Sequence, residues 1–212
     1  HQPEMQKLID HEIISFDKDV DELWLVGDIV NRGMNSLEVI EWCYEHQKNI
    51  KLVLGNHDLH FLSIALSIKS PSKKDTLSKV LSSPRLSLFV EWLISTPLIQ
   101  KNLNYVMSHA GLHPSWSLNK AIELSNSFCE SLYKDPEHTL KSMYGNEPKY
   151  WSNDLNKRDQ HRMTVNTMTR MRCLNKSEQL DFKYKGSLND IPKNLKPWFC
   201  FDTERHSNET LI

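Results

Sequence analysis

A chain of 212 residues can bury the core of one domain or of two small ones. Its 26 lysines and arginines nearly balance 27 acidic residues, and the net charge of -1 excludes strongly basic proteins that coat nucleic acids. No run approaches the roughly 20 apolar residues of a membrane span, and the four cysteines contain no C-x-x-C pair. We therefore expect a soluble cytoplasmic protein with neither a membrane partner nor a stable nucleic-acid partner.

The first third of the chain alternates predicted helices and strands. Apolar spacing predicts a helix over 3–14, a strand over 22–27, a helix over 36–46, a strand over 50–54 and a helix over 58–68. The last of these helices opens directly from a polar loop, which would aim its terminal N–H groups at a ligand.

The middle of the chain is less regular. Residues 69–85 form a polar surface segment with one short helix near 75–82, and a helix over 86–95 ends before Pro97. A hairpin of 98–100 with 105–107 and a helix over 117–133 follow. Beyond these, residues 135–200 mix prolines, aromatic and basic residues, and we interpret them as a cap over the site within a single domain spanning 1–212.

Polar residues follow three of the predicted strands. These clusters are Gly27-Asp28-Ile29-Val30-Asn31-Arg32-Gly33, Gly55-Asn56-His57-Asp58 and His109-Ala110-Gly111. Each alone is more simply a turn or a loop. Three at successive strand ends make coincidence unconvincing, because ligands bind at that edge of open α/β sheets.

The residue types in these clusters suit metal and phosphate chemistry. Asp28, Asn56 and His109 together offer a mixed oxygen and nitrogen ligand set for Mn²⁺, Mg²⁺, Co²⁺, iron or zinc. His57 can deliver a proton to a leaving oxygen, and Arg32 is a cationic fork for a phosphoryl group. This is the equipment of two-metal phosphoester or phosphoanhydride hydrolysis. Asp58 can either cap the following helix or orient the His57 ring.

The three clusters resemble the successive motifs of the calcineurin-like metallophosphatases. Longer words are similar to the bacterial symmetrical diadenosine tetraphosphatases within that superfamily. They are Leu54 to His60 (LGNHDLH), Met107 to Trp116 (MSHAGLHPSW), Met143-Tyr144-Gly145, Thr169-Arg170-Met171-Arg172 and Leu195-Lys196-Pro197-Trp198-Phe199. The resemblance extends over nearly the whole chain.

The resemblance implies an α/β (α+β) fold, namely a β-sandwich flanked by helices with a C-terminal cap segment. It implies two divalent metal ions, with Mn²⁺ expected and Co²⁺ or Mg²⁺ as alternatives, and symmetric hydrolysis of diadenosine tetraphosphate to two ADP by an activated hydroxide. Carried over by position, Asp28 bridges both metals, Asn56 and His109 bind the second, His57 donates the proton and Arg32 holds a phosphate. The oligomeric state is left open.

Three further positions bear on the substrate. Protein phosphatases of the superfamily usually carry an aspartate where this chain has Asn31, so a neutral residue here favours a good leaving group over phosphoserine. Arg170 and Arg172 lie two apart and would share a face of an extended segment, where they could grip a polyphosphate. Stacking of adenine on Tyr144, Trp151 or Trp198 is a weaker expectation than a packing role for these aromatic residues.

Two family elements are not found. An Asp-x-His or Asp-x-Gln element would precede the first helix, and His1 lies at about its distance without its context. A Gly-His element would follow Trp198, and His206 lacks that context as well. Either both lie outside these 212 residues or the chain is a degenerate relative. A phosphatase acting on other phosphoesters, such as a protein phosphatase, and a non-catalytic dinucleotide-binding relative are therefore the alternatives.

Overall fold

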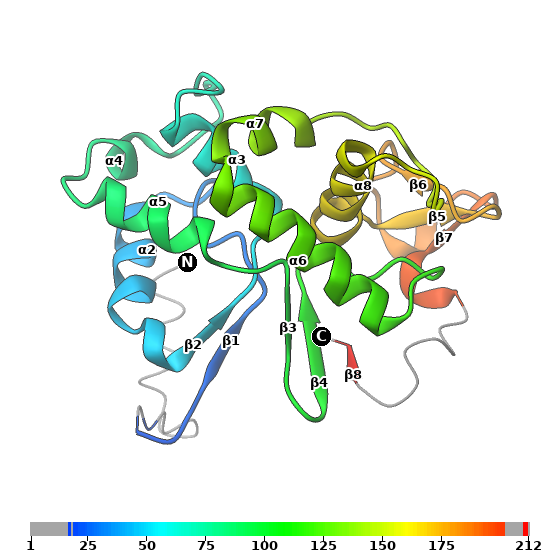
Figure 1. Ribbon diagram of the computed structural model, residues 1–212, viewed down its shortest axis with the longest axis horizontal. Helices are drawn as coiled ribbons and strands as arrows, with labels where there is room; N and C mark the ends of the chain where they lie inside the picture. The colour runs from blue at the N-terminus through cyan, green and yellow to red at the C-terminus, as the bar shows by residue number, and fades with distance from the viewer. Residues whose placement is uncertain (1–16, 18, 202–209, 212) are drawn as a thin grey trace.

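The computed structural model describes residues 17, 19–201 and 210–211. The helix predicted over 3–14 lies outside these residues, as do His1 and His206. Within them the chain combines helices with three small sheets, which confirms the mixed α/β class (Figure 1).

The first sheet pairs the two strands that precede the first two polar loops. Strand β1 (Leu23–Leu25) runs parallel to β2 (Ile50–Leu52), with Leu23 opposite Ile50. Helix α2 (Ser36–Glu45) and the 3-10 turn η1 (Gln47–Asn49) form the crossover that a parallel pair requires. The polar loops after both strands therefore lie at the same edge of the sheet.

The second sheet brings in the third polar loop. Strands β3 (Ile99–Lys101) and β4 (Tyr105–Ser108) form the predicted antiparallel hairpin, and β8 (Thr210–Leu211) pairs parallel to β4. A bond from the Leu54 amide to the Pro97 carbonyl, 2.9 Å long, links the end of the first sheet to the start of the second. The end of β4 is thereby held near the ends of β1 and β2.

Helices lie above the first two sheets in Figure 1, and α8 (Lys157–Arg170) lies beside the third sheet at the upper right. The former are α3 (Asn56–Ala65), α4 (Ser78–Leu81), α5 (Leu86–Ile94), α6 (Leu118–Lys134) and α7 (Pro136–Met143). In α6, the Ser117 side chain accepts a bond from the Lys120 amide at the N-terminus. Ala121, Leu124 and Phe128 form its buried stripe at helical spacing.

The segment 135–200 contains more structure than the sequence indicates. After α7 and α8 come β5 (Cys173–Asn175), β6 (Leu180–Asp181) and β7 (Leu195–Pro197), with β5 central in an antiparallel sheet, and the 3-10 turns η2 (Leu188–Asp190) and η3 (Trp198–Cys200). Helix α8 packs on α6 and α7 and buries Met163 and Met168 in the main core. The interpretation of 135–200 as a cap stays a prediction.

Candidate functional site

The loop after β1 has an unusual backbone. Asp28, Asn31 and Arg32 have φ of 55°, 71° and 61°, a left-handed region that non-glycine residues rarely adopt. At Gly27 the φ is 87°, and a Cβ there would lie 2.5 Å from the backbone nitrogen of Gly55. The first two polar loops therefore touch through backbone atoms, and only glycine fits between them.

Asp58 holds the two loops together. Its Oδ2 accepts bonds from the amides of Asp28 and Gly55, each 2.8 Å long, and its Oδ1 accepts one from the amide of Ile29 at 3.0 Å. Burial raises the pKa of this carboxyl to about 7, with the Asp28 charge acting in the same direction and the amide bonds opposing it. Of the two roles predicted for Asp58, the structure shows the helix cap at Gly55 and no bond to the His57 ring.

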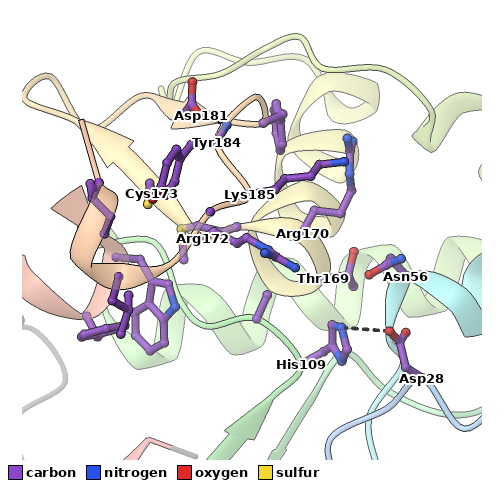
Figure 2. Close-up of a pocket in the computed structure, with 18 of the residues that line it drawn as sticks. Asp28, Asn56, His109, Thr169, Arg170, Arg172, Cys173, Asp181, Tyr184 and Lys185 are labelled. Carbon is purple, nitrogen blue, oxygen red and sulfur yellow. Dashed lines mark hydrogen bonds and ion pairs between the residues drawn. The ribbon is translucent and has the colours of Figure 1, made fainter. Parts of the chain in front are cut away.

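Three of the predicted site residues converge at the strand ends. Nε2 of His109 lies 3.5 Å from Oδ2 of Asp28, the contact drawn as a dashed line in Figure 2, where Asn56 is adjacent. Nδ1 of His109 donates to the Val26 carbonyl oxygen at 2.5 Å, so the ring proton is on Nδ1. The Nε2 atom is then the ring nitrogen that faces the carboxylate oxygen of Asp28.

That geometry suits a cation. Nε2 of His109 and Oδ2 of Asp28 face each other at 3.5 Å, and imidazole with carboxylate oxygen is a common donor pair for divalent metals. Within residues 17, 19–201 and 210–211, no three His, Cys, Asp or Glu side chains form a group able to hold a metal ion. The donor set is therefore this pair plus the Asn56 amide, enough for part of one metal's ligands.

Asn56 is the first residue of α3, at the positive end of that helix. The His57 amide donates to Oδ1 of Asp28 at 2.9 Å, so helix and carboxylate attract each other. With its amide turned so that Nδ2 donates to the Thr169 carbonyl at 3.1 Å, Oδ1 of Asn56 faces the His57 amide at 3.3 Å. Thr169 was not a predicted site residue, and no local pattern marks its carbonyl.

The His57 ring lies beside these groups. Its Nε2 is 4.0 Å from Oδ2 of Asp28, and its buried Nδ1 has no hydrogen-bond partner among the described residues. Burial lowers the pKa of His57, and the positive charge of Arg32 lowers it further, while Asp28 acts in the opposite direction. The His57 ring is therefore neutral and lies beside the Asp28 carboxylate.

Asn31 serves the loop and makes no bond to His57. Its Nδ2 donates to Oδ1 of Asp75 at 2.9 Å, and its Oδ1 accepts from the amides of Arg32 and Thr76. Burial raises the pKa of Asp75, but bonds from Asn31, Ser72 and His60 outweigh burial and hold it well below its usual range. Sequence reasoning missed Asp75, because it lies in a polar segment without periodicity.

A cavity of about 720 Å³ opens over the strand ends. In Figure 2, Asp28, Asn56 and His109 lie on one side, and Arg172, Cys173 and Tyr184 lie opposite. Arg32, His57, Arg170, Lys185, Phe199 and Trp198 also line it. All residues predicted to bind metal or substrate thus share one cavity, which exceeds the lower size bound of about 300 Å³ for ligand pockets.

The prediction of an extended segment carrying Arg170 and Arg172 is wrong. Arg170 is the last residue of α8, and its guanidinium donates to Oδ1 of Asn166 at 2.7 Å and lies 4.4 Å from the Phe182 ring centroid. Arg172 follows the helix end. The apolar period of this stretch is weak, because polar side chains such as Thr164 are buried along α8.

The expected packing role holds for Trp151, whose ring contacts that of Trp116 edge to face.

A second cavity of about 420 Å³ adjoins the first. Five residues line both: Arg32, Asn56, His57, Thr169 and Arg170. Its outer wall is made by residues that do not line the first cavity, among them Lys74, Met143, Tyr144 and Asn146.

This geometry agrees with comparison to known proteins. The chain belongs to the calcineurin-like phosphoesterase family, whose model matches residues 2–185. Membership of this hydrolase family implies divalent metal ions, and it confirms the resemblance seen in the strand-end motifs.

Individual curated relatives show which members of the family the chain is similar to. The chain is 39% identical over 204 residues to the symmetrical bis(5'-nucleosyl)-tetraphosphatase of Chromobacterium violaceum, covering 94% of this chain and 73% of the relative. It is 41% identical over 211 residues to the protein of the same name from Nitrosospira multiformis, covering 99% and 76%. A protein of that name from Neisseria meningitidis is 37% identical over 201 residues, covering 94% and 72%.

Proposed function

We propose that this chain hydrolyses dinucleoside tetraphosphates symmetrically and releases two ADP from diadenosine tetraphosphate. The observation that carries the proposal is the His109 and Asp28 pair, set at 3.5 Å beside Asn56 in a cavity that also holds Arg32, Arg170 and Arg172. The names of the relatives support the substrate, since those proteins are symmetrical bis(5'-nucleosyl)-tetraphosphatases.

Each site residue has a proposed role. Asp28, Asn56 and His109 would supply part of the ligand set of the two divalent cations proposed, with Mn²⁺ as the proposed metal, and bound cations would supply Lewis acidity for the attack on phosphorus. Arg32 would neutralise charge developing on the phosphate oxygens, while Arg170 and Arg172 would bind the polyphosphate chain. Asn31 and Asp58 would act by positioning the loops.

The neutral state of the His57 ring fits a phosphoanhydride substrate. A nucleotide phosphate leaves readily, since a phosphate of second pKa near 6 needs little protonation at neutral pH. The lowered pKa of His57 keeps its ring neutral, which limits its use as an acid. His57 would therefore contribute less than it would with a serine alkoxide as the leaving group.

The proposed compartment is the cytoplasm, on the ground of four thiols, all free, in the sequence. Separately, none of the helices that the structure describes has the length and apolar character of a bilayer crossing.

The test is manganese-dependent release of ADP from diadenosine tetraphosphate, followed by chromatography, together with the metal content of the protein. We expect ADP as the sole product. His109→Ala should abolish turnover and lower metal content, because the ring nitrogen facing Asp28 is lost. Full activity and normal metal content in His109→Ala would refute the site assignment. Metal-independent substrate binding without turnover in the unaltered protein would instead support the non-catalytic alternative.

A further inference from the structure

The two adjoining cavities are arranged around one centre. The five residues they share include Asn56, proposed to bind metal, and Arg32 and Arg170, proposed to bind phosphate, whereas Asp28 and His109 line the larger cavity only. Every other lining residue belongs to only one of the two cavities. A ligand passing from one cavity into the other would therefore lay its middle against the shared residues.

Each cavity pairs cations with aromatic surface. The larger one has Arg172 and Lys185 with Tyr184 and Trp198, and the smaller one has Lys74 with Tyr144. Cationic side chains bind phosphates and aromatic faces stack on bases. The chemistry that one nucleotide needs is thus present on both sides of the centre.

Tyr144 is held firmly in the smaller cavity. Its hydroxyl lies 3.3 Å from Nδ1 of His60, and the Lys69 ammonium lies 4.5 Å from its ring centroid. Arg170 forms part of the boundary between the cavities, because it lines both while its guanidinium bonds to Asn146 at 3.0 Å and to Asn166. A fixed aromatic ring next to a fixed cation costs little ordering entropy on binding.

We propose that the smaller cavity is a second nucleotide subsite, in which Tyr144 stacks on one base of the substrate and Lys74 meets its outer phosphate. The other nucleotide occupies the larger cavity, and the central phosphates lie against the shared residues. This rests on the proposed function and deepens it: cleavage is symmetric because the residues shared by the two cavities hold the central phosphates between two nucleotide subsites, next to the Asp28 and His109 pair. The volumes of about 720 and 420 Å³ both fall within the usual range for ligand pockets.

The first test fills the smaller cavity. Ser72 is exposed at its rim, and Ser82 is an exposed serine outside the residues that line either cavity. Ser72→Trp is compared with Ser82→Trp, using the KM for diadenosine tetraphosphate and the inhibition constant of adenosine 5'-tetraphosphate, which has one nucleoside and needs one subsite. We expect Ser72→Trp to raise the ratio of KM to inhibition constant tenfold or more, and Ser82→Trp to leave it at the wild-type value.

The second test removes the ring. Tyr144→Leu should raise the KM for diadenosine tetraphosphate five- to tenfold with a smaller change in kcat, and Tyr144→Phe, which keeps the ring, should recover most of that loss. If Ser72→Trp changes both constants equally, or neither, or if Tyr144→Leu and Tyr144→Phe behave alike, the second subsite is refuted. A wild-type protein that releases no ADP would refute the proposed function itself, which separates the two failures.

Discussion

Asp58 is a single carboxylate that fixes the relative position of two loops. It is fully buried, and its two oxygens accept amide bonds from Asp28, Ile29 and Gly55. Three converging N–H donors favour an acceptor-only group, which the ionised form of this carboxyl provides and an amide does not. The residues proposed to bind metal and phosphate on both loops depend on this one side chain for their spacing.

Asp58→Asn is expected to destabilise the protein by about 2 kcal/mol or more, because an amide NH₂ would face one or two backbone donors in a buried site. Turnover should fall as the Asp28 loop shifts. Urea unfolding measures the first effect and ADP release the second. Glu130→Gln, an exposed change on α6, is the control and should alter neither quantity. Wild-type stability in Asp58→Asn would contradict this account.

The segment between α3 and α5 contacts the loop that follows β1. Sequence reasoning treated residues 69–85 as a polar surface segment with a short helix, and α4 confirms the helix. The segment is also anchored, since the Asp75 side chain is only 7% exposed and accepts the bond from Asn31 across 44 positions of sequence. Arg32 follows Asn31 and has a left-handed backbone conformation. The contact between Asp75 and Asn31 therefore fixes the backbone position from which the Arg32 side chain extends.

Asp75→Ala should lower kcat roughly tenfold, since freeing Asn31 lets Arg32 leave the position that aligns it with phosphate. Asp75→Asn keeps one oxygen for Asn31 and should fall between the alanine variant and the wild type. Steady-state kinetics checks both. Glu38→Gln removes the charge from an exposed contact to Lys79, which also joins α2 to α4, and should leave kcat unchanged. A wild-type kcat in Asp75→Ala would refute the positioning role proposed for Asp75.

Across the whole molecule, α8 connects the core to the site. Its C-terminal turn bonds to the third polar loop, through the Ala110 amide and the Met168 carbonyl at 2.8 Å, and Thr169 meets Asn56. At its other end His161 is 6% exposed, with Nε2 at 3.0 Å from Oγ of Ser127 on α6. Burial lowers the pKa of His161 to about 4, and Lys157 adds to this effect.

A histidine with a lowered pKa makes stability depend on pH. The unfolded chain takes up a proton near pH 6.5, whereas the folded protein does so only near pH 4, so stability is lost as the pH falls between these values. We expect a loss on the order of 1–2 kcal/mol between pH 7.5 and 5 that is absent in His161→Gln. Urea unfolding at both pH values, in both proteins, checks this. Equal losses in the two proteins would contradict it.

Local sequence alone determined much of this protein. Short apolar runs predicted β1, β2 and the β3–β4 hairpin, and the sequence after Ser117 predicted α6, because these features depend on neighbouring residues. The order of the three polar clusters also indicated the site and the family. Parallel pairing of two strands is enough to bring the ends of both strands to one edge.

Tertiary structure decided the rest. The helix of Arg170 escaped prediction because buried polar residues such as Asn166 obscure its apolar period. The bonds of Asp58, the Asp75 contact to Asn31 and the Thr169 carbonyl beside Asn56 join residues far apart in sequence. No local pattern encodes such pairs, because they exist only once the sheets and α8 have packed together. The division of the site into two cavities arises for the same reason.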